Sequence, residues 1–297
     1  MTRRTIVAIA LVISALTACA DPATPGSNDD ASATGAIAHA TGPSDLVLQV
    51  GYQGGYTPVD YQLTNMPFFS LYGDGTLITP GPQIEIYPAP ALASIQQQTI
   101  TEDGVQAILQ AALDAGLGEA KDMTDMGSVG IADAPDTVFT IRTDALDRTI
   151  RVYALSELGP DRPQGMDRDE FEARQALSAL VSDLNDLGSW LPAGSIDGEQ
   201  TGYEAPAARV YVGEYRDAED LPQPAIAWPL DAPLGSFGSA DSSYGYGCTV
   251  VAGSDWTDSV MPLAEGANQL SPWRSEGTRY ALVFRQLLPD EVDPAGC

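Results

Sequence analysis

Hydrophobic positions in the first half of the chain alternate with polar ones, or recur at helical spacing, in separate short stretches. Runs rich in β-branched and aromatic residues, bounded by Gly and Pro, are typical of strands. Gly73-Asp74-Gly75 lies between two such runs, and a glycine that accepts positive φ at this point predicts a hairpin. The strands that we expect here are 46–50, 68–72, 76–78, 83–87, 137–143 and 149–155.

Two longer stretches predict helices. In 102–115 the apolar residues repeat on one helical face, Thr101 can act as the N-cap, and Gly116 can end the helix. In 167–187 a second apolar stripe runs up to Gly188. The residues of the two stripes are Val105, Ile108, Leu109, Ala112 and Leu113, then Phe171, Leu177, Leu180, Val181 and Leu184.

The pattern changes after a loop of Gly, Pro and acidic residues near 192–206. Strand-like runs follow at 209–215, 225–228, 249–251 and 279–284, with one short helical stretch at 258–267. The sequence therefore predicts an α+β fold, with antiparallel or mixed sheets and two main helices, followed by a β-rich C-terminal part. We expect parts at 44–196 and 204–297 that pack together, either as one large domain or as two modules.

The N-terminus has the composition of a targeting segment. Arg3 and Arg4 precede an apolar run that ends in Leu16-Thr17-Ala18-Cys19, and this run is shorter than the roughly 20 residues a membrane-spanning helix needs. These four residues resemble the lipobox of bacterial lipoprotein precursors. The resemblance implies removal of a signal peptide, 1–18, and a lipid-modified Cys19 at the new N-terminus. An ordinary secretory peptide that is cleaved elsewhere is the alternative.

The segment after Cys19 is small, polar and interrupted by Pro and Gly, so it buries too little apolar surface to order itself. We expect 19–43 to be a disordered tether. With the lipobox, this predicts a protein held on the extracytoplasmic face of the cell membrane by its lipid alone.

Acidic residues outnumber basic ones by a wide margin. The chain has 14 Lys and Arg, 41 Asp and Glu and a net charge of −27, which becomes −29 once Arg3 and Arg4 are removed. Such a charge repels phosphate backbones, so nucleic acid is excluded as a partner.

The cysteine count becomes even once lipidation is considered. Modification of Cys19 leaves Cys248 and Cys297, and an oxidising compartment favours a disulfide between them. A two-cysteine metal site without a nearby histidine is the weaker alternative.

The single histidine, His39, falls within the expected tether, where it would have no fixed geometry. Serine–histidine and cysteine–histidine catalysis, histidine-bound zinc and histidine-bound haem all need that residue. We therefore predict no cofactor and a non-catalytic protein, with carboxylate chemistry, or Ser or Tyr activation without His, as the forms of catalysis left open.

Aromatic residues of the second part are the candidate ligand-binding residues, because Trp and Tyr offer large contact areas with a polar end. They are Trp228, Tyr244, Tyr246, Trp256 and Trp273. Packing in a small core is the alternative role. A second candidate group could bind Ca²⁺ or supply an acid–base pair, although the chain lacks a calcium-loop motif. Its members are Asp241, Asp255, Asp258 and Glu265.

These observations predict a lipid-anchored protein with a binding or structural role in the cell envelope, whose ligand is a glycan, a peptide or a protein. The alternatives are a carboxylate-dependent hydrolase of an envelope glycan and an adhesion module stabilised by Ca²⁺.

Overall fold

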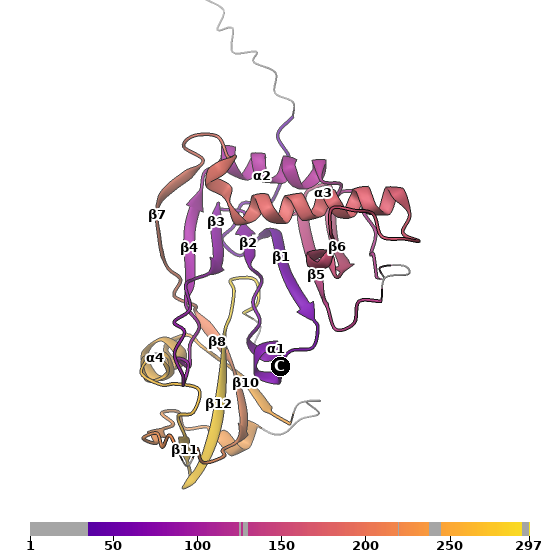
Figure 1. Cartoon of the computed structure of the whole chain (residues 1–297). Helices are drawn as coiled ribbons and strands as arrows, with labels where there is room; N and C mark the ends of the chain where they lie inside the picture. The colour runs from indigo at the N-terminus through magenta and orange to yellow at the C-terminus, as the bar shows by residue number, and fades with distance from the viewer. Residues whose placement is uncertain (1–34, 125, 127–129, 219, 238–244, 293–296) are drawn as a thin grey trace, which may run out of the picture. The chain divides into compact units, whose positions relative to one another are not determined.

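The first sheet contains seven strands, all of them antiparallel to their neighbours. A computed structural model describes residues 35–124, 126, 130–218, 220–237, 245–292 and 297 (Figure 1). The sheet order is β6-β5-β1-β2-β3-β4-β7. Its strands are β1 (Leu46–Gly54), β2 (Phe69–Tyr72), β3 (Thr76–Pro80), β4 (Ile95–Ile100), β5 (Pro135–Thr143), β6 (Leu146–Tyr153) and β7 (Ile196–Gly202).

Two helices, α2 (Glu102–Asp114) and α3 (Arg168–Asn185), cover one face of this sheet (Figure 1). Their apolar stripes meet β1, β2 and β5 in one core, which includes Leu48, Phe69, Ile108 and Leu177. Asp167 caps α3, since its side chain accepts hydrogen bonds from the backbone N–H groups of Asp169 and Glu170. Thr101 occupies the N-cap position of α2, but its side chain makes no capping bond.

The second sheet has five strands in the order β10-β8-β12-β11-β9, with β11 and β9 parallel and the other pairs antiparallel. A π-helical turn, η4 (Asp255–Val260), runs into α4 (Met261–Glu265), and both pack on this sheet. The strands are β8 (Ala207–Glu214), β9 (Ile226–Ala227), β10 (Gly247–Ala252), β11 (Trp273–Ser275) and β12 (Thr278–Gln286).

Short elements join these layers. The helix α1 (Val59–Thr64) follows β1 and contacts β12, so that the first and second sheets meet there. The remaining elements are the 3-10 turns η1 (Leu155–Glu157), η2 (Leu187–Ser189) and η3 (Leu234–Phe237). Residues 37–297 form one compact unit, and β7 extends the first sheet beyond the expected boundary at 196.

The predicted fold class is confirmed: the protein is α+β, with an antiparallel sheet, a mixed sheet and α2 and α3 as the two main helices. One expected strand is absent, because 83–87 lies outside both sheets. The strands β3 and β4 pair directly from Thr76–Thr99 to Pro80–Ile95, so the residues between them leave the sheet as a loop.

The expected tether is shorter than predicted at its C-terminal end. Ile37 and the side chain of Gln106 exchange two hydrogen bonds, at 2.7 and 3.0 Å, and Ala38 accepts one from the backbone of Asp144. The residues from Ile37 onward therefore lie along the folded body, held by these hydrogen bonds and by the packing of Ile37 against the first core. Residues 35 and 36 are exposed, and the rest of the expected tether, the signal peptide and Cys19 fall outside the described residues.

Candidate functional site

The three tryptophans of the predicted ligand-binding set do not form a surface. Trp228, Trp256 and Trp273 are 8%, 0% and 1% exposed and belong to the core under the second sheet. Trp273 packs edge-on against Trp228 and Phe284, with ring centroids 6.1 and 5.5 Å apart. A small sheet with few long aliphatic runs fills its core with these rings, which corrects the binding-face hypothesis.

The tyrosines of that set are placed differently. Tyr246 donates a hydrogen bond of 2.9 Å to Asp60 in α1, and its ring lies against Gly213, where a Cβ atom would clash at 2.6 Å. Burial, followed by the bond to Asp60, raises the pKa of Tyr246 to about 12. Tyr246 therefore joins the edge of the second sheet to α1, and Tyr244 falls outside the described residues.

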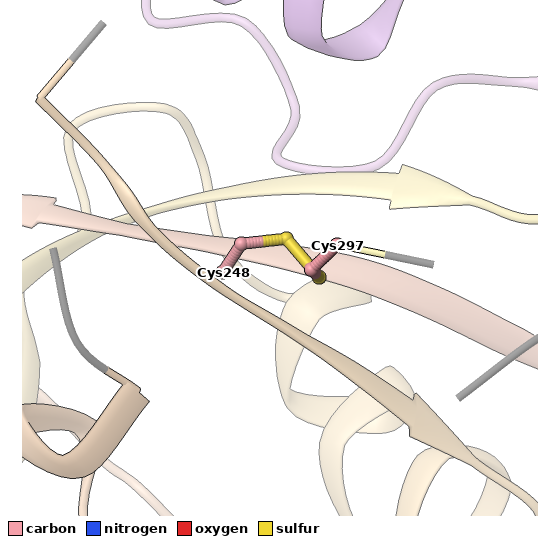
Figure 2. The surroundings of a disulfide bond; sticks show 2 residues. All are labelled: Cys248 and Cys297. Atoms are coloured by element: carbon pink, nitrogen blue, oxygen red, sulfur yellow. A yellow bond between two sulfur atoms is a disulfide. The ribbon is translucent and has the colours of Figure 1, made fainter. Parts of the chain in front are cut away.

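The two C-terminal cysteines are joined. Cys248 in β10 and Cys297 form a disulfide with Cα atoms 5.7 Å apart (Figure 2). The last residue of the sequence is thereby fixed to an edge strand of the second sheet.

His39 has a defined position, contrary to the sequence-based expectation. Its side chain is 3% exposed, and its ring nitrogens lie 2.8 Å from the Ala40 carbonyl and 3.3 Å from Glu102 at the start of α2. Within the part of the chain that the structure describes, no Ser, Thr or Cys side chain is hydrogen-bonded to this ring. The placement fits a role in docking the N-terminal segment onto α2.

A groove of about 600 Å³ lies where α1, the β3–β4 loop and β12 meet, and we call it the apolar groove. It exceeds the hollows beside Lys121 and beside Gln98, of about 470 and 480 Å³. Its apolar lining includes Tyr52, Tyr61, Met66, Phe68, Ile84, Leu92 and Phe284, and its polar lining includes Asn65, Gln83, Arg285 and Gln286.

The walls of the apolar groove are held by local contacts. Tyr52 stacks on Phe68 with ring centroids 5.3 Å apart, and the side chain of Asn65 donates to the Tyr52 carbonyl. Burial raises the pKa of Tyr52, so its hydroxyl stays protonated and can donate a hydrogen bond. Tyr61 and Ile84 are 51% and 66% exposed, which leaves apolar surface at the mouth of the groove.

Arg285 is the one charged residue among the described residues that line the groove, and its charge is balanced. Its guanidinium donates to both oxygens of Glu291, at 2.6 and 2.7 Å, and to the Asn65 carbonyl at 3.2 Å. The groove therefore offers a nearly neutral, largely apolar lining within a strongly acidic protein.

The segment after β12 returns to the first sheet beside this pair. Leu288 is fully buried with Ile78 and Ile95, and the buried Tyr72 hydroxyl donates to Asp290 at 2.7 Å. Asp290 is exposed as a residue, yet the burial of its carboxyl group raises its pKa above the ordinary 3.8, and the hydrogen bond from Tyr72 only partly opposes this.

A smaller cavity of about 290 Å³ adjoins the apolar groove and shares Tyr52, Tyr61 and Asn65 with it. Thr57 lines this cavity, and its buried hydroxyl makes no hydrogen bond to any described residue. A buried hydroxyl without a partner carries a free-energy cost that a hydrogen bond would remove. The cavity thus extends the groove past Thr57.

Two acidic residues, Asp133 and Glu157, also line the smaller cavity. Both are exposed as residues. The predicted acidic group lies elsewhere: Asp255, Asp258 and Glu265 are exposed on η4 and α4, and Asp241 falls outside the described residues.

The described ranges contain neither a metal cluster nor a membrane-spanning helix. No three His, Cys, Asp or Glu side chains gather there closely enough to hold a metal ion. Among the helices in those same ranges, none combines the length and apolar composition needed to cross a bilayer. Comparison with family models, curated proteins and solved structures finds no match to this chain.

The apolar groove was missed by sequence reasoning because its residues come from four separate stretches. The available signal was the pair of tyrosines in Gly-Tyr-Gln-Gly-Gly-Tyr, 51–56, but nothing in this stretch alone places it beside the other three. Tyr52 lines both the groove and the smaller cavity, and Tyr56 is 89% exposed beside them.

Proposed function

We propose that this protein is a lipid-anchored binding protein of the extracytoplasmic face, and that its ligand is a peptide segment held in the apolar groove. The supporting observation is the groove itself, at about 600 Å³ and lined mainly by aromatic and aliphatic side chains. This volume is within the range of ligand pockets, which combine an apolar lining with a few polar groups.

The lining favours peptide side chains over a glycan. Met66, Ile84 and Leu92 are aliphatic and supply no hydrogen bonds from their side chains, whereas a sugar presents hydroxyl groups that need partners. The guanidinium of Arg285 is already engaged by Glu291, so an anionic ligand finds no free cation in this lining.

Binding can be tested with small blocked probes before the natural ligand is known. We expect N-acetyl-leucinamide to show saturable saturation-transfer NMR signals with the protein, and chitobiose to show none. Ile84→Ser should weaken the leucine probe about fivefold or more, because it removes apolar surface at the mouth of the groove.

Leu263→Ser is the matched control, since Leu263 is 38% exposed on α4 and does not line the groove. The melting temperature of each variant establishes that it is folded. Equal weakening by both substitutions, or the absence of saturable transfer in the wild-type protein, would count against a groove ligand.

The anchor is tested separately. Expression in a bacterium that processes lipoproteins should yield a chain that starts at a diacylated Cys19 and sediments with membranes. Cys19→Ser should release the protein into the soluble extracytoplasmic fraction. An unprocessed wild-type chain of full mass would rule out the lipobox.

A carboxylate-dependent hydrolase is the second candidate, and the shared cavity of Asp133 and Glu157 is the observation that favours it. A glycoside hydrolase needs one of two nearby carboxyl groups to stay protonated, usually by burial. Here both residues are exposed. Release of reducing ends from envelope glycan by the wild-type protein, lost in Asp133→Asn and Glu157→Gln, would establish this activity in place of simple binding.

A further inference from the structure

The segment 83–87 has the sequence of a strand but no strand partner. Gln-Ile-Glu-Ile-Tyr is rich in residues that favour strands, yet the segment belongs to neither sheet. All of its residues are exposed, with Ile84 at 66%, Ile86 at 57% and Tyr87 at 68%. Three large apolar side chains on five consecutive exposed residues are unusual for a loop.

The backbone of this segment is largely unpaired. Among described residues, the one backbone–backbone hydrogen bond within 83–87 runs from the Ile86 N–H to the Ile84 carbonyl, at 3.0 Å. None of these residues adopts a positive φ. Apart from this γ-turn bond, the backbone N–H and C=O groups of the exposed segment are unpaired among the described residues, and such groups are a template for an added strand.

The base of the segment is fixed. The side-chain amide of Gln83 donates to the carbonyls of Gly81 and Ser94, at 3.0 and 2.9 Å, and accepts from the Ser94 N–H at 3.3 Å. Gly81 also donates to the Ser94 carbonyl at 2.9 Å. The segment therefore projects from a closed loop base, which reduces the ordering cost of binding.

The segment borders the apolar groove, since Gln83 and Ile84 belong to its lining. A strand laid alongside 83–87 would carry its side chains past Ile84. Because successive side chains of a strand point to opposite sides, every second residue of that strand could enter the groove.

Building on the proposed peptide-binding function, we propose that the ligand adds a β-strand to Gln83–Tyr87 and inserts alternate apolar side chains into the apolar groove. Strand addition takes its affinity from main-chain hydrogen bonds and its specificity from side-chain pockets. The intervening residues of the ligand are basic, because Glu85 is exposed and the whole chain carries a charge of −27.

The same charges oppose pairing between two copies of this chain. Strand pairing of two 83–87 segments would bring the two Glu85 carboxylates close together, and like charges on facing strands are destabilising. Two bodies of the same strong negative charge also repel as they approach.

The probe is the blocked peptide Ac-Lys-Val-Lys-Ile-Lys-Val-Lys-NH2, measured by isothermal titration calorimetry. We expect it to bind at least about tenfold more tightly than the same peptide with Glu in place of Lys. N-methylation of alternate backbone nitrogens should weaken it by about tenfold or more, because the donors are lost while the side chains remain.

Two substitutions at one residue provide the matched pair in the protein. Glu85→Pro removes a backbone N–H and should weaken the affinity for the peptide by about tenfold or more. Glu85→Gln keeps this N–H and should weaken the affinity only a few-fold, and by less at high salt, where the lost charge is screened. Exposure of Glu85 makes both variants compatible with folding, which melting curves establish.

The outcomes separate this inference from the binding function. If N-methylation and Glu85→Pro leave affinity unchanged while Ile84→Ser removes it, strand addition is wrong and the groove function stands. Strand addition is also wrong, and the groove function still stands, if N-acetyl-leucinamide binds and the peptide does not. If neither N-acetyl-leucinamide nor the peptide binds, both the groove function and strand addition are wrong. If the protein forms a dimer that Glu85→Pro dissociates, a second copy of the chain occupies the segment, and the inference is overturned.

Discussion

The ion pair between Arg285 and Glu291 gives a quantitative test of how the groove is supported. The two side chains are 9% and 26% exposed and share two hydrogen bonds of 2.6 and 2.7 Å. Glu291 also accepts from the Leu288 backbone N–H at 3.0 Å, so it orders the segment that follows β12. The perturbation is Glu291→Gln, which keeps the shape and removes the charge.

Removal of one partner from a buried pair costs about 3–5 kcal/mol, because the other charge is left uncompensated. The partial exposure of Glu291 lets water replace some of the lost interaction. We therefore expect the free energy of unfolding to fall by about 2–3 kcal/mol. The Asn65 carbonyl still accepts from Arg285 and limits the loss.

Urea denaturation followed by circular dichroism measures this change. The double variant Arg285→Met/Glu291→Gln should recover much of the loss, because it leaves no unpaired charge. Glu172→Gln is the control: its partner Arg168 is 80% exposed, and the cost should stay below about 0.5 kcal/mol. A loss in Glu291→Gln no larger than the control, or simple additivity in the double variant, would refute the reasoning.

Three further predictions address stability. Replacing Cys248 and Cys297 by Ser removes a cross-link across 49 residues and should lower the free energy of unfolding by up to about 4 kcal/mol; equal urea midpoints for the oxidised and reduced wild-type protein would contradict this. Trp273→Ala should cost about 3–5 kcal/mol by the same measurement, and a loss below about 1 kcal/mol would be inconsistent with its packed position. The raised pKa of Asp290 means that protonation of this carboxyl stabilises the folded state, fully below pH 3.8 and progressively less as the pH rises through the folded-state pKa. Asp290→Asn should therefore raise the melting temperature at pH 7 and lose this advantage near pH 3, whereas a lower melting temperature at pH 7 would contradict the assignment.

Elements with a strong internal period were predictable from sequence. The spacing of Val105, Ile108, Leu109 and Ala112 located α2, and these four residues are buried, whereas Leu113 of the predicted stripe is only half-buried. The hairpin around Gly75 is present because this glycine has φ of 85° and packs against the Ile100 carbonyl, where a Cβ atom would clash.

Elements stabilised by their neighbours were not predictable. In β4 three successive glutamines hide the strand pattern, and β7 has few hydrophobic residues and is mostly exposed. The segment 83–87 shows the reverse case: its β-propensity is strong, but direct pairing of β3 with β4 leaves it outside the sheet.

The apolar groove was harder to predict from the sequence than any helix or strand, because it exists only in the tertiary structure. Tyr52 and Phe284 are more than 200 positions apart, and only the return of β12 to α1 brings them into one groove. The aromatic cluster that stood out in the sequence became core, because Trp228, Trp256 and Trp273 are the largest apolar volumes available to the second sheet.

The arrangement of the four tryptophans gives each layer its own optical reporter. Trp190 packs at the edge of the first core and donates to the Asp183 carbonyl, whereas Trp228, Trp256 and Trp273 lie together in the second. In a Trp190→Phe chain, all indole emission would come from the second layer. Comparison of its unfolding curve with that of the unmodified chain would then reveal whether the two layers lose their structure at the same urea concentration.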